Sequence, residues 1–329
     1  MDAPPDVGPR IVLRTAWPQE ALRRFAKAFP EARIVACPAD AGLDEHLDAA
    51  EILVGGPDLA PALAARAPRL RWVQTLSVGV DGFLEVARSR PELQVTNVRG
   101  VNVTPLAEHA LMLMLSFARG MPELARRQAA RDWRPPDWAH VPKVFELSGA
   151  TLGLLGYGEI GRAIAERARA FGMSVQALRR GGAGGPDGLA ERIVGPSGLP
   201  ALLAGSDHVV ATLPLTAQTH RLMDDAAFAR MRPGAFFYNL GRGAVVDHEA
   251  LIAALRSGRI GGAGLDVVDP EPLPADSPLW SLPNVMITGH TAGFTPRLVA
   301  RNVEFLEAQL GRWRRGEPLE NRIDPASGY

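Results

Sequence analysis

The chain has 329 residues, about twice the length of a common single domain, so we expect two domains. With 47% hydrophobic and 22% charged residues it has the composition of a folded globular protein, which argues against disorder. The 36 basic and 36 acidic residues give a net charge of +0, which removes the electrostatic argument for a nucleic-acid or anionic-membrane partner. The single cysteine, Cys37, excludes a disulfide framework and fits a reducing compartment.

The N-terminal residues lack the basic segment and apolar run that mark a signal peptide. The longest apolar stretch, at 110–118, is far shorter than the ~20 residues that span a bilayer. No spacing of histidines and acids is typical of a metal site, so no metal is expected. These observations predict a soluble, cytoplasmic protein.

Short β-rich runs alternate with helical patterns from the start of the chain. The runs predict strands at 11–13, 33–36, 52–56 and 72–75. A helix is predicted at 20–29, between the first two strands. This alternation predicts βα units, in which helices cover both faces of a parallel sheet. A long apolar helix at 106–119 and a connection rich in proline and tryptophan at 132–138 then interrupt the pattern.

A second series of βα units begins at Thr151. It predicts strands at 152–155, 174–178, 208–212, 235–238, 263–268 and 285–288. Helices are predicted at 159–171, 248–256 and about 296–315, and a glycine-dense loop at 181–188. The fold class that follows is α/β, with two doubly wound parallel-sheet domains.

The clearest local motif is Gly156-Tyr157-Gly158-Glu159-Ile160-Gly161, which lies between a predicted strand and a predicted helix. In this context Gly156 permits the tight turn, Gly158 lets a pyrophosphate approach the backbone, and Gly161 lets helix and strand pack closely. The N-terminus of the helix offers unpaired N–H groups to the phosphates. The motif therefore predicts a dinucleotide site, although glycines at this spacing can also mark a surface turn.

The residues after the next strand indicate which dinucleotide binds. An NAD site usually places an acid there, where it accepts hydrogen bonds from the ribose hydroxyls. This chain has Arg179 and Arg180 instead, and no acid at 175–182. Guanidinium groups bind a 2′-phosphate, so the sequence favours NADPH and leaves NAD open. The alternative is that both arginines are simply solvated.

Further motifs follow in order along nearly the whole chain, at 75–81, 101–109, 213–219, 239–247, 264–273 and 289–293. Together with the glycine run, they make the chain resemble the D-isomer-specific 2-hydroxyacid dehydrogenase family. Gly289 departs from the pattern, since many members have proline before the histidine. The resemblance implies a flavodoxin-like substrate domain at 1–101 plus 292–329 and a Rossmann cofactor domain at 102–291. A cleft would separate the two domains.

The resemblance also implies a catalytic set of Arg242, Glu271 and His290. His290 would donate the proton that accompanies hydride transfer to a keto group, and Glu271 would stabilise its imidazolium form. Arg242 would bind the substrate carboxylate and polarise the carbonyl group. Each of the three follows a predicted strand, at the edge where open α/β sheets bind ligands. Taken alone, each could instead be an ordinary loop or surface residue.

The remaining site residues are implied by the family motifs. Substrate binding would also involve Val78, Gly79 and Asn102. Cofactor binding would also involve Leu213, Pro214, Thr219 and Asp266, the last through the nicotinamide carboxamide. Glu108 and His109 are assigned to helix packing and the hinge, not to catalysis. The apolar helix at 106–119 would form the core of a homodimer interface, and the alternative is that it is buried within one subunit.

Within the family, the arginine pair favours a glyoxylate/hydroxypyruvate reductase that uses NADPH. An NAD-dependent D-lactate-type or phosphite dehydrogenase remains open, whereas a formate dehydrogenase is disfavoured because that branch has glutamine at the position of Glu271. A non-enzymatic, dinucleotide-sensing protein that resembles the family's corepressors is the alternative from another functional class.

Overall fold

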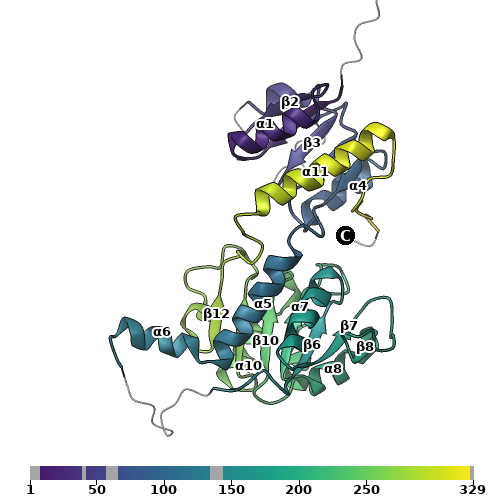
Figure 1. Ribbon diagram of the computed structural model, residues 1–329. Helices are drawn as coiled ribbons and strands as arrows, with labels where there is room; N and C mark the ends of the chain where they lie inside the picture. The colour runs from purple at the N-terminus through teal and green to yellow at the C-terminus, as the bar shows by residue number, and fades with distance from the viewer. Residues whose placement is uncertain (1–7, 39–41, 57–65, 134–143, 327–329) are drawn as a thin grey trace, which may run out of the picture. The chain divides into compact units, whose positions relative to one another are not determined.

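A computed structural model describes residues 8–38, 42–56, 66–133 and 144–326 (Figure 1). The chain divides into two compact units. Unit 1 consists of Met1–Asn102 and Thr295–Tyr329, and unit 2 consists of Val103–Phe294. The assignment of substrate binding to one unit and cofactor binding to the other stays a prediction.

Unit 1 contains a parallel sheet of five strands in the order β2-β1-β3-β4-β5. The strands are β1 (Arg10–Arg14), β2 (Arg33–Ala36), β3 (Ile52–Gly55), β4 (Trp72–Thr75) and β5 (Gln94–Thr96). Its described helices are α1 (Gln19–Ala28), α2 (Asp44–Leu47), α4 (Leu84–Ser89) and the C-terminal α11 (Leu298–Arg315). This strand order is the flavodoxin-like form of a doubly wound sheet.

Unit 2 contains a parallel sheet of seven strands in the order β12-β11-β10-β9-β6-β7-β8. The strands are β6 (Thr151–Leu155), β7 (Ser174–Leu178), β8 (Arg192–Val194), β9 (His208–Ala211), β10 (Phe236–Asn239), β11 (Gly262–Leu265) and β12 (Val285–Ile287). Its helices are α5 (Val103–Ala118), α6 (Met121–Ala129), α7 (Glu159–Ala170), α8 (Leu199–Gly205), α9 (Asp225–Arg230) and α10 (His248–Arg256). The order is that of a Rossmann sheet, so the prediction of two doubly wound domains is confirmed.

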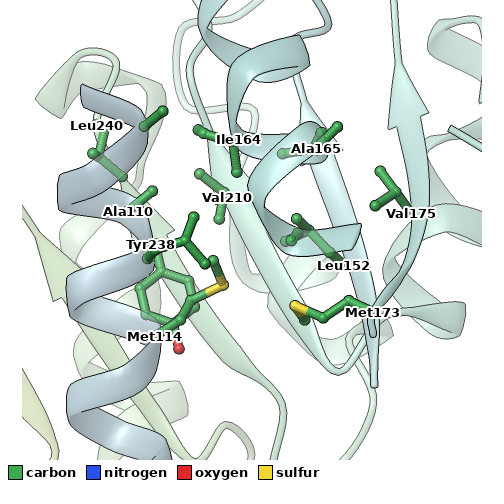
Figure 2. Packing of buried hydrophobic residues seen from close by; sticks show 14 of the residues in the cluster. Ala110, Met114, Leu152, Ile164, Ala165, Met173, Val175, Val210, Tyr238 and Leu240 are labelled. Carbon is green, nitrogen blue, oxygen red and sulfur yellow. The ribbon is translucent and has the colours of Figure 1, made fainter. Parts of the chain in front are cut away.

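The core of unit 2 includes a cluster in which α5 and α7 pack side by side on one face of the sheet (Figure 2). Ala110 and Met114 of α5 and Ile164 of α7 belong to this cluster, and all three are completely buried. The strands beneath contribute Val210 and Tyr238. Removal of such side chains from water stabilises the fold by about 1.5–3 kcal/mol for each large apolar residue. This packing fixes the N-terminus of α7, and with it the glycine run, against β6.

The structure differs from the sequence prediction at several elements. The strands β5 and β8 and the helix α6 were not predicted, and none of the α6 residues is buried. The predicted strand at 263–268 ends at Leu265, because the chain turns and the Val268 amide donates to Glu271 Oε1. Most of the predicted connection at 132–138 lies outside the described residues. Among the described residues, no helix is long and apolar enough to cross a membrane.

Candidate active site

The carboxyl edge of the unit 2 sheet gathers the predicted site residues of that unit. Strand order reverses between the neighbours β6 and β9, which is where open α/β sheets bind ligands. The glycine run follows β6, and Leu213 follows β9. Arg242, Glu271 and His290 follow β10, β11 and β12, which are adjacent in the sheet. Parallel strands therefore bring residues that are far apart in the sequence to one edge.

The glycine run has the geometry of a phosphate-binding loop. Gly156 has a φ of +104°, and a Cβ there would lie 2.8 Å from Thr212 Oγ1. A Cβ on Gly161 would lie 2.3 Å from the Gly156 carbonyl oxygen, so both positions need glycine. A Cβ on Gly158 would meet nothing within 4 Å, and no side chain caps α7 there. The open space beside uncapped helix amides fits a pyrophosphate.

The other residues of the run make structural contacts, and their part in cofactor binding stays a prediction. Tyr157 is 6% exposed, and its hydroxyl donates to Asp187 Oδ1 at 2.9 Å. Ile160 packs against the core cluster. Glu159 lies in the first turn of α7, where the positive end of the helix dipole stabilises an acidic side chain. Tyr157 thus ties the glycine run to the glycine-dense loop after β7.

Asp187 is a residue of this region that the sequence analysis missed. It accepts hydrogen bonds from Tyr157, from the Arg162 guanidinium and from the Leu189 and Ala190 amides. The Ala190 amide is the main cause that holds the pKa of Asp187 well below its usual range. Burial raises the pKa of Tyr157 to about 12, so its hydroxyl remains a donor. The sequence feature that could have identified Asp187 is an acidic residue within a glycine-dense loop.

Arg179 and Arg180 follow β7 and are both exposed. The Arg179 carbonyl accepts from the Gly182 amide at 3.3 Å, so the chain turns directly after the strand. The Arg179 guanidinium lies over Gly184, since a Cβ there would be 3.2 Å from its Nη2. Two exposed guanidinium groups therefore stand after β7, where NAD sites carry an acid.

His290 and Glu271 form a hydrogen-bonded pair. The His290 Nδ1 lies 2.7 Å from Glu271 Oε2, and Glu271 Oε1 accepts from the Val268 amide at 3.1 Å. Because Nδ1 is paired with the carboxylate, Nε2 is the nitrogen that can exchange a proton with a substrate. The His290 side chain is 55% exposed, which leaves it accessible. The pair thus has the chemistry of a general acid and base held by a carboxylate.

The backbone around Arg242 packs tightly against the neighbouring loops. Its carbonyl oxygen accepts from Asn239 Nδ2 at 2.9 Å, and its Nη1 donates to the Gly241 carbonyl at 2.8 Å. A Cβ on Gly243 would lie 1.9 Å from the Val268 carbonyl oxygen, so only glycine fits there. The turn that carries Arg242 is therefore seated on the loop that leads to Glu271.

Asp266 follows β11 and is 3% exposed. Its carboxylate accepts from the Thr288 hydroxyl and from the Thr291 and Ala292 amides. The structure thus gives Asp266 a local role in holding the chain after β12, and its contact with the nicotinamide stays a prediction.

Other predicted residues lie in loops whose polar groups are occupied locally. The Thr219 hydroxyl donates to the Pro214 carbonyl at 2.6 Å, which favours a role in holding its own loop. A Cβ on Gly241 would lie 2.6 Å from the Leu213 carbonyl oxygen, so this loop adjoins that of Arg242. The roles of Leu213, Pro214 and Thr219 in cofactor binding stay predictions.

The predicted substrate residues Val78, Gly79 and Asn102 belong to unit 1. The Val78 carbonyl accepts from Asn97 Nδ2 at 2.9 Å, and the Gly79 carbonyl accepts from the Ser77 hydroxyl at 2.7 Å. Side chains thus shape this loop from within unit 1. The participation of these residues in substrate binding stays a prediction.

Comparison with known proteins identifies the family. The model of the D-isomer specific 2-hydroxyacid dehydrogenase, NAD binding domain, matches residues 111–292. The chain belongs to the D-isomer specific 2-hydroxyacid dehydrogenase family. The family resemblance predicted from the motifs is therefore confirmed.

Relatives and solved structures of this family match most of the chain. Glyoxylate/hydroxypyruvate reductase B of Citrobacter koseri is 37% identical over 87% of this chain and 89% of its own length. A family member from Aeromonas salmonicida has a TM-score of 0.86 at 34% identity, over 96% of this chain and 99% of its own. One from Xanthobacter autotrophicus, solved with NADPH and MES, has a TM-score of 0.81 at 31% identity, over 98% and 99%.

Membership of this 2-hydroxyacid dehydrogenase family settles the general class of the protein. It is an oxidoreductase, and the residues that match the NAD binding domain model lie within unit 2. Within the described residues, no group of three or more histidines, cysteines and acids is placed to hold a metal ion.

Proposed function

We propose that this family member reduces a small 2-keto acid of the glyoxylate or hydroxypyruvate type to the D-2-hydroxy acid. The observation that carries the proposal is the 2.7 Å contact between His290 and Glu271 at the sheet edge that also presents the glycine run and Arg242. The reductase name of the Citrobacter koseri relative supports this substrate class.

The residues of unit 2 account for the steps of this reduction. The glycine run and the α7 N-terminus would hold the dinucleotide, which would supply the hydride when bound. His290 donates the proton to the carbonyl oxygen through Nε2, and Glu271 stabilises the imidazolium before that transfer. Arg242 binds the substrate carboxylate and polarises the carbonyl group. In the oxidative direction, His290 accepts the proton.

We propose further that the preferred dinucleotide is NADPH. Arg179 and Arg180 supply exposed positive charge where a 2′-phosphate would lie. The nearby acid, Asp187, is engaged with Tyr157, Arg162 and two amides, which leaves it poorly suited to bind ribose hydroxyls. The NADPH in the Xanthobacter autotrophicus structure is consistent with this preference.

One assay tests both the substrate and the cofactor. With glyoxylate or hydroxypyruvate, the protein is expected to oxidise NADPH at least about tenfold more efficiently than NADH, since each lost charge-assisted hydrogen bond costs about 1.5–3 kcal/mol. The measurement is kcat/KM for both cofactors over a panel of 2-keto acids. Absence of turnover over the whole panel would favour the dinucleotide-sensing alternative.

The arginine pair is tested in the same assay by the double substitution Arg179→Ser and Arg180→Ser. It is expected to raise KM for NADPH and to leave KM for NADH nearly unchanged. Arg256→Ser, at an exposed position in the last turn of α10, is the matched control. Equal efficiency of wild type with the two cofactors, or an unchanged preference in the double variant, would refute the NADPH proposal.

We also propose that a second copy of the chain covers an apolar groove of unit 2. Its lining is formed by Glu108, Leu111, Met112, Leu115, Ser116, Arg119, Met121, Arg167 and Phe171. Met112, Met121 and Phe171 are each about two-fifths exposed or more, at 39%, 47% and 43%. Figure 1 shows α6 extending away from the unit 2 sheet, and none of its residues is buried. Within the described residues of unit 2, these apolar side chains are thus left partly exposed.

The charges of the groove suit two copies of one chain. An interface with two-fold symmetry contains each contact twice. If one residue of the first copy contacts a second residue of the other copy, the same two positions also meet with the copies exchanged. Glu108 lies in the same groove as Arg119 and Arg167, so two copies can form the same ion pair twice. The groove is therefore self-complementary in charge as well as apolar.

The homodimer is expected to dissociate in the variant Met112→Glu, because a new carboxylate in place of an apolar side chain would have to be removed from water in the interface. Sedimentation equilibrium over a range of concentrations measures the change. Trp280→Glu is the control, since Trp280 is 54% exposed and lies outside the groove lining. A monomeric wild type, or a Met112→Glu variant that remains dimeric, would contradict the proposed interface.

A further inference from the structure

The turn that carries His290 is held by one buried residue. Three successive amides, those of His290, Thr291 and Ala292, donate to Asp266. The His290 amide lies 2.6 Å from its backbone carbonyl oxygen, and the other two lie 2.9 and 3.1 Å from Oδ1. Asp266 thus fixes the backbone on the C-terminal side of the proposed general acid.

The backbone of this turn needs such support. Gly289 and His290 both have a φ of +58°, in the left-handed region. For a residue other than glycine this conformation costs about 1–3 kcal/mol and persists only where the surroundings enforce it. Gly289 does not restrain the backbone of this turn, because glycine has the widest choice of backbone conformations. The position of the His290 ring therefore depends on contacts such as the Asp266 hydrogen bonds.

Asp266 is in turn held by a side chain from α5. The Thr288 hydroxyl donates to Asp266 Oδ1 at 2.7 Å, so its single proton is already used. The His109 Nε2 lies 2.9 Å from the same hydroxyl oxygen and must therefore be the donor in that contact. Burial lowers the pKa of His109, against an opposing effect of Asp266, and this favours the neutral ring. Since Nε2 is the donor to Thr288, the neutral ring carries its proton there.

The resulting chain of hydrogen bonds runs in one direction. His109 donates to Thr288, and Thr288 donates to Asp266. The His109 side chain is 14% exposed and the Asp266 side chain 2%, so water competes little for either group. A buried carboxylate that loses such a donor is costly, because its desolvation is no longer compensated.

We propose that His109 is a positioning residue that acts through Thr288 and Asp266 to hold His290 in its pairing with Glu271. The inference rests on the proposed function of His290 and extends beyond the packing role predicted for His109. Without the donor, the Thr288 hydroxyl can rotate away from Asp266. The turn then loosens, and the His290 ring spends less time where proton transfer is possible.

The test compares variants that remove the donor with variants that restore it. His109→Leu and Thr288→Val are each expected to lower kcat for keto-acid reduction about 10- to 100-fold, the scale of a small misplacement of a catalytic group. KM for the dinucleotide should change less than about threefold, because the glycine run is untouched. His109→Gln keeps an N–H near the position of Nε2, and Thr288→Ser keeps the hydroxyl, so both should recover most of the rate.

A second measurement does not depend on activity. Hydrogen exchange of the Thr291 and Ala292 amides is expected to become at least about tenfold faster in His109→Leu and Thr288→Val than in the wild type, because these amides lose a fixed acceptor. His109→Gln should restore their protection. If the wild type reduces no keto acid, the proposed function fails, whereas this exchange pattern still tests whether His109 orders the turn.

A buried histidine of the same unit provides the control. His208 lies at the amino end of β9, where its Nδ1 is 3.0 Å from the Tyr238 hydroxyl, and burial lowers its pKa to about 4. His208→Gln is expected to lower thermal stability but to leave kcat and the exchange of the two amides unchanged. Wild-type kcat and exchange in His109→Leu, or equal losses in His109→Leu and His109→Gln, would overturn the proposal.

Discussion

Substitution of His290 by glutamine is expected to lower kcat for keto-acid reduction by about 10²- to 10⁴-fold, the usual contribution of a general acid. Glutamine has a similar reach and can still donate a hydrogen bond to Glu271, but its amide cannot deliver a proton to an alkoxide. The glycine run and the two arginines after β7 are unchanged in this variant. The affinity for NADPH should therefore stay within about threefold of the wild type.

Steady-state rates with glyoxylate measure the first effect, and a fluorescence titration with NADPH measures the second. His46→Gln is a matched control in unit 1, where the His46 ring contacts Arg10 Nη2 at 3.1 Å. Its rate should equal that of the wild type. If His290→Gln retained more than about a tenth of the wild-type rate, His290 could not be the main proton donor.

The parts of the fold and site that the sequence predicted are those with local signals. The glycine run lies between a strand and a helix, and the steric reasons for Gly156 and Gly161 can be stated from the motif alone. The family resemblance implied the grouping of Arg242, Glu271 and His290. It agrees with the rule that residues following strands of a parallel sheet lie at one edge. The structure then adds the 2.7 Å contact between Glu271 and His290.

The parts that could not be predicted depend on contacts between distant residues. His109 and Thr288 are 179 residues apart, and Tyr157 and Asp187 are 30 apart. No periodicity or local propensity relates such pairs, because the contact exists only after the sheet has formed. Gly243 is a similar case, since its need for glycine comes from the Val268 carbonyl of a neighbouring loop.

Substitution of Arg242 is the second change with a large expected effect. It distinguishes the contribution of the guanidinium's shape from the contribution of its charge. Arg242→Lys should lower kcat/KM for glyoxylate by about 10²- to 10³-fold, the cost of losing one well-placed donor to developing negative charge. Lysine keeps the positive charge but binds as a point charge, so it cannot hold the carboxylate and polarise the carbonyl with one planar fork.

Chemical rescue makes this prediction specific. Arg242→Ala should lose at least as much activity as Arg242→Lys, and added guanidinium ion should restore part of it, because the free cation can occupy the position of the missing group. Arg221→Ala is the control, since Arg221 is a largely exposed partner of Asp247 at 3.4 Å. If Arg242→Ala instead weakened NADPH binding and left KM for the keto acid unchanged, Arg242 would belong to the cofactor site. Wild-type kcat/KM in Arg242→Lys would show that charge alone suffices and that the forked geometry contributes nothing.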